Sequence, residues 1–84
     1  MTEQQALDLI KDALAEVAPD RADDFATLSA DMTIEDLALD SVTTMEMIGV
    51  LEEKVDRTFP DEELPKVNAL RDICTLLRTG KVTA

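Results

Sequence analysis

Two neighbouring side chains, Asp40 and Ser41, stand where a long polar stretch gives way to a regular apolar pattern. Asp is a favoured N-cap, because its carboxylate accepts the free amide protons of the first helical turn and its charge complements the helix dipole. Ser41 then takes the first helical position, where a bulky group could be attached to its hydroxyl without disturbing the core. The alternative left open is a capping pair with no further role, since any helix start can show one.

The residues that usually activate a nucleophile are missing from this sequence. It contains no His, and its single Cys, Cys74, cannot form an internal disulfide. A Ser hydroxyl is a weak nucleophile without an adjacent base, so we predict that the chain is not an enzyme and has no catalytic residues. Cys74 falls on an apolar helix face, which favours a buried, unreactive thiol.

Composition limits the classes of partner. The 84 residues fit one small domain, residues 1–84, and we expect a monomer. Nineteen Asp and Glu against eight Lys and Arg give a net charge of -11, which repels nucleic acid and anionic membranes and favours basic protein partners. No apolar run is long enough to cross a bilayer, and the first residues lack the pattern of a signal peptide, so we expect a soluble cytoplasmic protein.

A first helix is predicted from a capping box at Thr2 and Gln5 to about Ala18, where Pro19 stops it. Its apolar residues recur at helical spacing. They are Leu7, Ile10, Leu14 and Val17.

Residues 19–40 lack sustained periodicity and are predicted to form a long loop. The loop nevertheless carries large apolar residues, so we expect it to be pinned to the core. These are Phe25, Leu28, Met32, Ile34, Leu37 and Leu39. Thr33 is expected to cap a short turn through Asp36. The acids Asp20, Asp23 and Asp24 lack the spacing and the Gly of a calcium loop, which favours a solvated charge run and predicts no metal site.

A second helix is predicted from about Ser41 to Asp56. Its core stripe consists of Thr44, Met47, Ile48, Leu51 and Val55. Its other side mixes exposed apolar groups with carboxylates and is a candidate partner-binding face, made of Val42, Met45, Glu46, Gly49, Glu52 and Glu53. The alternative is an ordinary solvated face with two stray hydrophobic residues.

The last third of the chain predicts a turn or very short helix, limited by Pro65, and then a final helix. Asn68 is the expected cap of that helix, and Gly80 lies just past its end. Its apolar face carries Leu70, Ile73, Cys74 and Leu77. We therefore predict an all-α four-helix bundle with three longer helices, one short third helix and a long loop between helices one and two. Residues 81–84 are expected to be a frayed tail.

The segment Asp40-Ser41-Val42, the acidic helix after it and residues 59–63 together resemble the acyl carrier proteins of fatty acid and polyketide synthesis. The resemblance covers most of the chain. It implies that Ser41 is modified with 4′-phosphopantetheine from coenzyme A, and that Asp40 supports the reaction by helping to hold the magnesium of the transferase. The thiol of the arm would then carry acyl groups as thioesters.

The resemblance also implies partners. These are a phosphopantetheinyl transferase and acyl-loading, ketosynthase-type and other acyl-processing enzymes whose basic patches dock on the acidic face. The chain departs from the usual pattern with Val42 in place of Leu, Ala38 in place of a turn Gly, Gly49 in place of a large apolar residue, and Pro65 in the short helix. Two alternatives remain: a free-standing aminoacyl or peptidyl carrier, and an unmodified helical adaptor that only binds partners.

Overall fold

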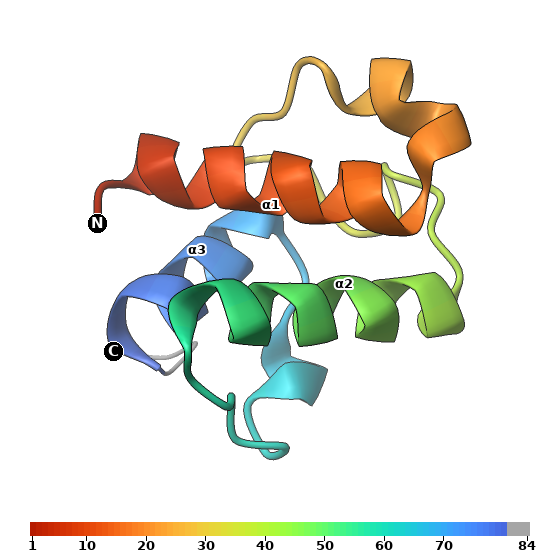
Figure 1. Cartoon of the computed structure of the whole chain (residues 1–84). Coiled ribbons are helices and arrows are strands. Elements are labelled where there is room, and N and C mark those ends of the chain that lie inside the picture. The colour runs from red at the N-terminus through yellow and green to blue at the C-terminus, as the bar shows by residue number, and fades with distance from the viewer. Residues whose placement is uncertain (81–84) are drawn as a thin grey trace.

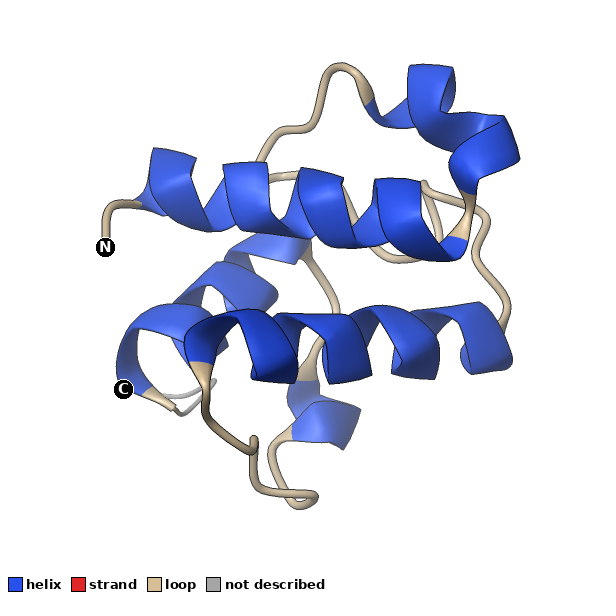
Figure 2. Cartoon of the chain, in the orientation of Figure 1, coloured by secondary structure: helices blue, strands red, loops and turns tan. Residues whose placement is uncertain are grey.

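The computed structural model describes residues 1–80 as three α-helices and two 3-10 helices. In chain order they are α1 (Glu3–Val17), η1 (Pro19–Phe25), α2 (Ser41–Val55), η2 (Leu64–Lys66) and α3 (Leu70–Thr79). Helices α1 and α2 lie side by side with opposite chain directions, and α1 also packs on α3 (Figure 1). No strand occurs within residues 1–80 (Figure 2). The all-α prediction with a short third helix, η2, is confirmed, whereas the expected tail at 81–84 lies outside the described residues.

The start of α1 is the predicted capping box. The hydroxyl of Thr2 accepts the Gln5 N–H at 3.1 Å, and the Gln5 side chain accepts the Thr2 N–H at 2.8 Å. These two bonds satisfy amide protons that have no partner inside the helix. The helix ends at Val17, because Pro19 has no amide proton to continue the pattern.

The prediction that residues 19–40 are loop throughout was wrong at their beginning. Pro19 stops α1 but also opens η1, since its fixed φ suits the first position of a helix. The Arg21 N–H bonds to the Ala18 carbonyl at 3.0 Å, which is the three-residue spacing of a 3-10 helix. The buried ring of Phe25 then anchors the end of η1 in the core.

The cap of α3 also differs from the prediction. The N-cap is Ala69 rather than Asn68. The carboxylate of Asp72 reaches back and accepts the N–H groups of both residues, at 2.9 Å from Asn68 and 3.0 Å from Ala69. The side chain of Asp72, inside the first turn, therefore accepts the hydrogen bonds at this helix start, whereas Asn68 was expected to cap it. Gly80 ends α3 as predicted, with the positive φ of 83° that favours glycine.

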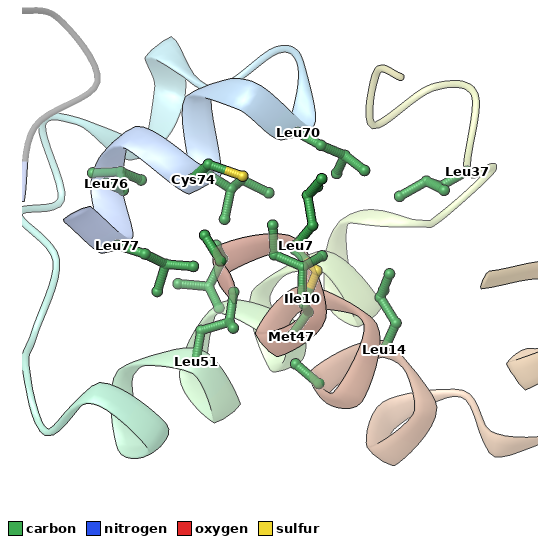
Figure 3. Packing of buried hydrophobic residues seen from close by; sticks show 14 of the residues in the cluster. Leu7, Ile10, Leu14, Leu37, Met47, Leu51, Leu70, Cys74, Leu76 and Leu77 are labelled. Carbon is green, nitrogen blue, oxygen red and sulfur yellow. The ribbon is translucent and has the colours of Figure 1, made fainter. Parts of the chain in front are cut away.

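One apolar cluster joins the three α-helices (Figure 3). Ten residues that the sequence places on the apolar sides of the helices are buried: Leu7, Ile10, Leu14, Met47, Ile48, Leu51, Leu70, Ile73, Cys74 and Leu77. Val55 and Thr44, which were placed in the core stripe of α2, are only partly buried. They lie near the two ends of α2, where fewer neighbours cover the helix, so the centre of α2 supplies its fully buried residues.

The connection from residue 26 to residue 40 is tied to the start of α3, as the pinned-loop prediction requires. The Ile34 N–H donates to the Asn68 carbonyl at 3.0 Å, and the Leu70 N–H donates to the Met32 carbonyl at 2.8 Å. These bonds flank an isolated antiparallel bridge between Thr33 and Ala69. Backbone pairing across 36 residues of sequence therefore fixes the middle of the connection.

Leu51→Ala should lower the free energy of unfolding by about 2 to 5 kcal/mol, because Leu51 is fully buried and the truncation leaves a cavity. Urea unfolding followed by circular dichroism measures the change. Val42→Ala is the control, since Val42 is exposed and its truncation should change the free energy of unfolding by no more than about 0.5 kcal/mol. Equal unfolding midpoints for the Leu51 variant and the wild-type protein would remove Leu51 from the core.

Candidate functional site

Ser41 is the first residue of α2, and Asp40 is its N-cap, as the sequence predicts. The Asp40 carboxylate accepts the Thr43 N–H at 2.7 Å, while the Asp40 carbonyl accepts the Thr44 hydroxyl at 2.9 Å. Both Asp40 and Ser41 are exposed. The cap therefore fixes the backbone beneath a serine hydroxyl that solvent, or another protein, can reach.

The charge of Asp40 is stabilised by the same cap. The hydrogen bond from the Thr43 N–H, with a second from the Thr43 side chain, lowers the pKa of the Asp40 carboxyl below its ordinary value. A hydrogen bond to the ionised form favours that form. Asp40 is consequently a fixed negative charge next to Ser41 at neutral pH.

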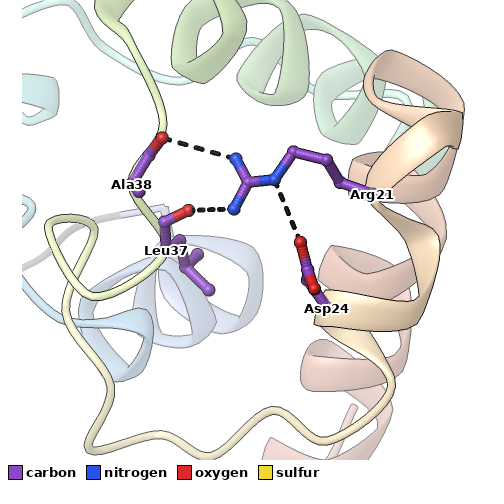
Figure 4. Close-up of polar contacts among 4 residues, drawn as sticks. All are labelled: Arg21, Asp24, Leu37 and Ala38. Carbon is purple, nitrogen blue, oxygen red and sulfur yellow. Dashed lines mark hydrogen bonds and ion pairs between the residues drawn. The ribbon is translucent and has the colours of Figure 1, made fainter.

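The turn before Asp40 takes an unusual backbone conformation. Ala38 has a φ of 55°, in the left-handed region that glycine adopts more readily. The turn follows a reciprocal pair, as predicted for Thr33: its hydroxyl accepts the Asp36 N–H at 3.1 Å, and the Asp36 carboxylate accepts the Thr33 N–H at 3.0 Å. Arg21, which the sequence analysis did not single out, reaches this turn from η1 (Figure 4).

The predicted partner face divides into two parts. Val42, Met45 and Glu46 are exposed and line a shallow surface hollow together with Ser41. Val42 is 66% exposed and Met45 54%, so apolar surface lies open beside the serine. Gly49 instead lies toward the other end of α2, in a second hollow. That hollow is lined by Gly49, Glu52, Glu53, Asp56, Arg57 and Thr58.

Glu52 differs from the other acids of the predicted partner face, because its carboxylate already has a partner inside the protein. Its side chain is half-buried, and its carboxylate accepts the Phe59 N–H at 2.7 Å. Phe59 is buried, so this bond holds the chain that leaves α2 against the core. Helical periodicity placed Glu52 on the outer side, but it could not reveal that the chain folds back over that position. Glu53 remains exposed.

A small apolar cavity of about 130 Å³ lies beyond the surface hollow at Ser41. It is lined by Ile34, Thr44, Met45, Ile48, Leu64, Val67 and Ile73. Met45 borders both the cavity and the hollow. The residues that line this cavity could not be named from the sequence, because they come from four separate segments. The only sequence signal was the presence of apolar residues in the connections around Ile34 and Val67.

Cys74 is buried as predicted, and burial raises the pKa of its thiol to about 11. The neutral thiol is a poor nucleophile at neutral pH. Among residues 1–80, no helix is both long and apolar enough to span a membrane.

The comparisons with known proteins agree with this geometry. The family model described as the phosphopantetheine attachment site matches residues 8–77. An acyl carrier protein of Exiguobacterium sp. is 32% identical over 80 residues, covering 94% of this chain and 98% of that protein. Acyl carrier proteins of Wolinella succinogenes and Helicobacter hepaticus are 38% identical over 48 residues, so the match spans 57% of this chain and only 63% of either relative. No solved structure matches significantly.

Asp40→Asn tests the charge of the cap, because Asn is as good a cap but does not titrate. As the pH falls, Asp40 in the unfolded chain is protonated near pH 3.9. In the folded protein the same carboxyl is protonated only at a lower pH, because its pKa is lowered. Asp40 therefore stabilises the fold above about pH 4, and this contribution is lost as the pH falls through the folded pKa. Urea unfolding between pH 7 and pH 3 should show the difference between wild type and variant shrinking in that window.

The control for net charge is Asp12→Asn, which removes one exposed carboxylate from α1. A stability difference between wild type and Asp40→Asn that stays constant across the whole pH range would contradict the role of the ionised cap.

Proposed function

This chain belongs to the family of phosphopantetheine attachment domains, and on that premise we propose that it carries acyl groups as thioesters on a 4′-phosphopantetheine arm attached to Ser41. Acyl carrier proteins, to which the chain is similar, are carriers and not enzymes. The observation that supports Ser41 most directly is its exposed hydroxyl at the first position of α2, directly after the Asp40 cap. The other serine, Ser29, lies within the connection.

The surroundings of Ser41 suit the attachment reaction. Ser41 lines a shallow hollow, which leaves room for the pyrophosphate of coenzyme A to approach. A bond forms between Ser41 Oγ and the phosphorus of coenzyme A that bears the pantetheine, while the bond from that phosphorus to the bridging oxygen breaks. The nucleotide phosphate leaves with that oxygen and the electron pair, and the hydroxyl proton passes to a base of the transferase. Asp40 supplies a fixed negative charge that can help to hold the magnesium of the transferase. When attached, the arm supplies a thiol for thioester formation.

The apolar cavity suits an aliphatic acyl group. Thr44 and Met45 line it from α2 and lie three and four residues after Ser41, on the same side of the helix. Six of its seven lining residues are apolar, and the Thr44 hydroxyl is occupied by the Asp40 carbonyl. A charged aminoacyl group would lose its hydration there without gaining a partner. We therefore favour fatty acid or polyketide biosynthesis over an aminoacyl or peptidyl carrier.

The exposed part of the partner face suits docking by basic enzymes. Val42 and Met45 offer apolar area beside Ser41, and Glu46 and Glu53 add negative charge along α2. Complementary charge raises the rate of encounter and fixes register more than it raises affinity. The proposed partners are a phosphopantetheinyl transferase and acyl-loading, ketosynthase-type and other acyl-processing enzymes.

Ser41→Ala should fold like the wild-type protein, because an exposed hydroxyl at the first helical position contributes little to stability. It should gain no mass when incubated with coenzyme A and a phosphopantetheinyl transferase. Ser29→Ala is the matched control and should gain one phosphopantetheine group, as the wild type does. Intact-protein mass spectrometry reads out all three proteins. A mass gain in the Ser41 variant would overturn the assignment, and an unmodified wild type would favour the adaptor.

The double variant Glu46→Lys/Glu53→Lys should react several-fold more slowly with the transferase at low salt, because it reverses charge on the docking face. Added salt should reduce this difference as the Debye length falls below about 10 Å. Asp8→Lys/Asp12→Lys makes the same change in net charge on α1, away from Ser41, and should retain most of the wild-type rate. Equal rates for the two double variants would favour an ordinary solvated face. Glu52 is left intact in both because it bonds to Phe59.

A further inference from the structure

Arg21 joins η1 to the turn that leads into Ser41 (Figure 4). One guanidinium nitrogen, Nη2, donates to the Leu37 carbonyl at 2.7 Å, and the other, Nη1, donates to the Ala38 carbonyl at 3.3 Å. The contact spans 16 or 17 residues of sequence, so it ties together segments whose relation the local chain does not fix. The Arg21 side chain is 33% exposed, and solvent therefore competes only partly for these bonds.

The guanidinium is itself held in place by two further contacts. Its Nε donates to the Asp24 carboxylate at 3.3 Å, and its Cζ lies 5.2 Å from the centre of the Phe25 ring. Phe25 is fully buried, so the ring is a fixed platform for the cation. Arg21 thus presents its two remaining guanidinium nitrogens to the turn in a defined orientation, which suits the planar guanidinium fork.

The two carbonyls that Arg21 holds lie on either side of Ala38. The Leu37 carbonyl belongs to the peptide group before the Ala38 α-carbon, and the Ala38 carbonyl belongs to the peptide group after it. Their orientations depend on the φ and ψ of Ala38, respectively. Ala38 has the left-handed φ of 55°, which an L residue with a Cβ adopts at a cost that glycine does not bear. The two bonds from Arg21 oppose that cost.

We propose that Arg21 is a positioning residue for the modification of Ser41, because it holds Ala38 left-handed and thereby fixes how the chain enters α2. This inference rests on the proposed function, since Ser41 must be the attachment site. Only Leu39 and Asp40 separate Ala38 from Ser41, and Leu39 is partly buried against the core. A change at Ala38 therefore moves the Asp40 cap and the serine relative to the docking face. Arg21 thus stabilises a left-handed conformation that a glycine at position 38 would adopt without help.

The effect should appear in substrate recognition by the transferase. Without the two bonds, Ala38 relaxes and only a fraction of the molecules presents Ser41 in the geometry that the transferase binds. The apparent affinity then falls by that fraction, while the chemical step in the bound complex is unchanged. We expect Arg21→Met to raise the KM for the carrier about tenfold and to leave kcat within about twofold.

The decisive variant is Arg21→Met/Ala38→Gly. Glycine adopts the left-handed conformation without help, so the double variant should recover most of the wild-type KM, and Ala38→Gly alone should differ little from wild type. Arg78→Met removes one exposed Arg from α3 and controls for the change in net charge. Amide NMR shifts of Leu39 and Ser41 should move in Arg21→Met and return toward their wild-type values in the double variant.

Two outcomes would overturn the inference. One is a wild-type KM for Arg21→Met in a preparation whose wild-type protein is modified at Ser41, which would leave the proposed function standing. The other is a raised KM that Ala38→Gly does not relieve, which would mean that Arg21 contacts the transferase directly. Should Arg21→Met fail to fold, Arg21→Lys replaces it, because Lys keeps the charge but lacks the fork that holds two carbonyls. Its KM should lie between the wild-type and tenfold values, and Ala38→Gly should relieve it in the same way.

Discussion

Burial of apolar side chains from residues 19–40, in the core that the three α-helices share, is the constraint on which the rest of this structure depends. Phe25 and Leu37 are buried with the helical leucines, although they come from segments without helical periodicity. Backbone pairing near Thr33 and Ala69 adds a second attachment. A connection held at these places cannot swing freely, so the residues that follow it enter α2 along one path.

Acidic residues have two different roles on α2. Glu46 and Glu53 are exposed and leave their charge available to a partner, whereas Glu52 turns its carboxylate to the Phe59 N–H. A net charge of -11 opposes compaction through mutual repulsion, and an internal hydrogen bond offsets part of that effect locally. The acidity of this helix is therefore partly a feature of recognition and partly a feature of the fold.

The turn before Ser41 illustrates how a distant contact can replace local conformational freedom. Many turns adopt a positive φ through glycine, but this chain has Ala38 there and an Arg21 that holds the adjoining carbonyls. The 3-10 helix η1 contributes to this turn, because it holds Arg21 over the ring of Phe25. A segment that reads as a solvated charge run thereby contributes to the geometry of the site.

The sequence by itself determined the α-helices, the capping box at Thr2 and the Asp40 cap before Ser41, because each depends on residues within about four positions of one another. Only the tertiary structure decided the hydrogen bond of Glu52 to Phe59, the lining of the apolar cavity and the hydrogen bonds of Arg21 to the turn. The hydrogen-bond partners of Glu52 and Arg21 lie 7 to 17 residues away in the sequence. The residues that line the cavity come from four segments. Periodicity indicates which side of a helix faces the core. It does not indicate which carbonyl, amide or side chain from a distant part of the sequence will contact that helix.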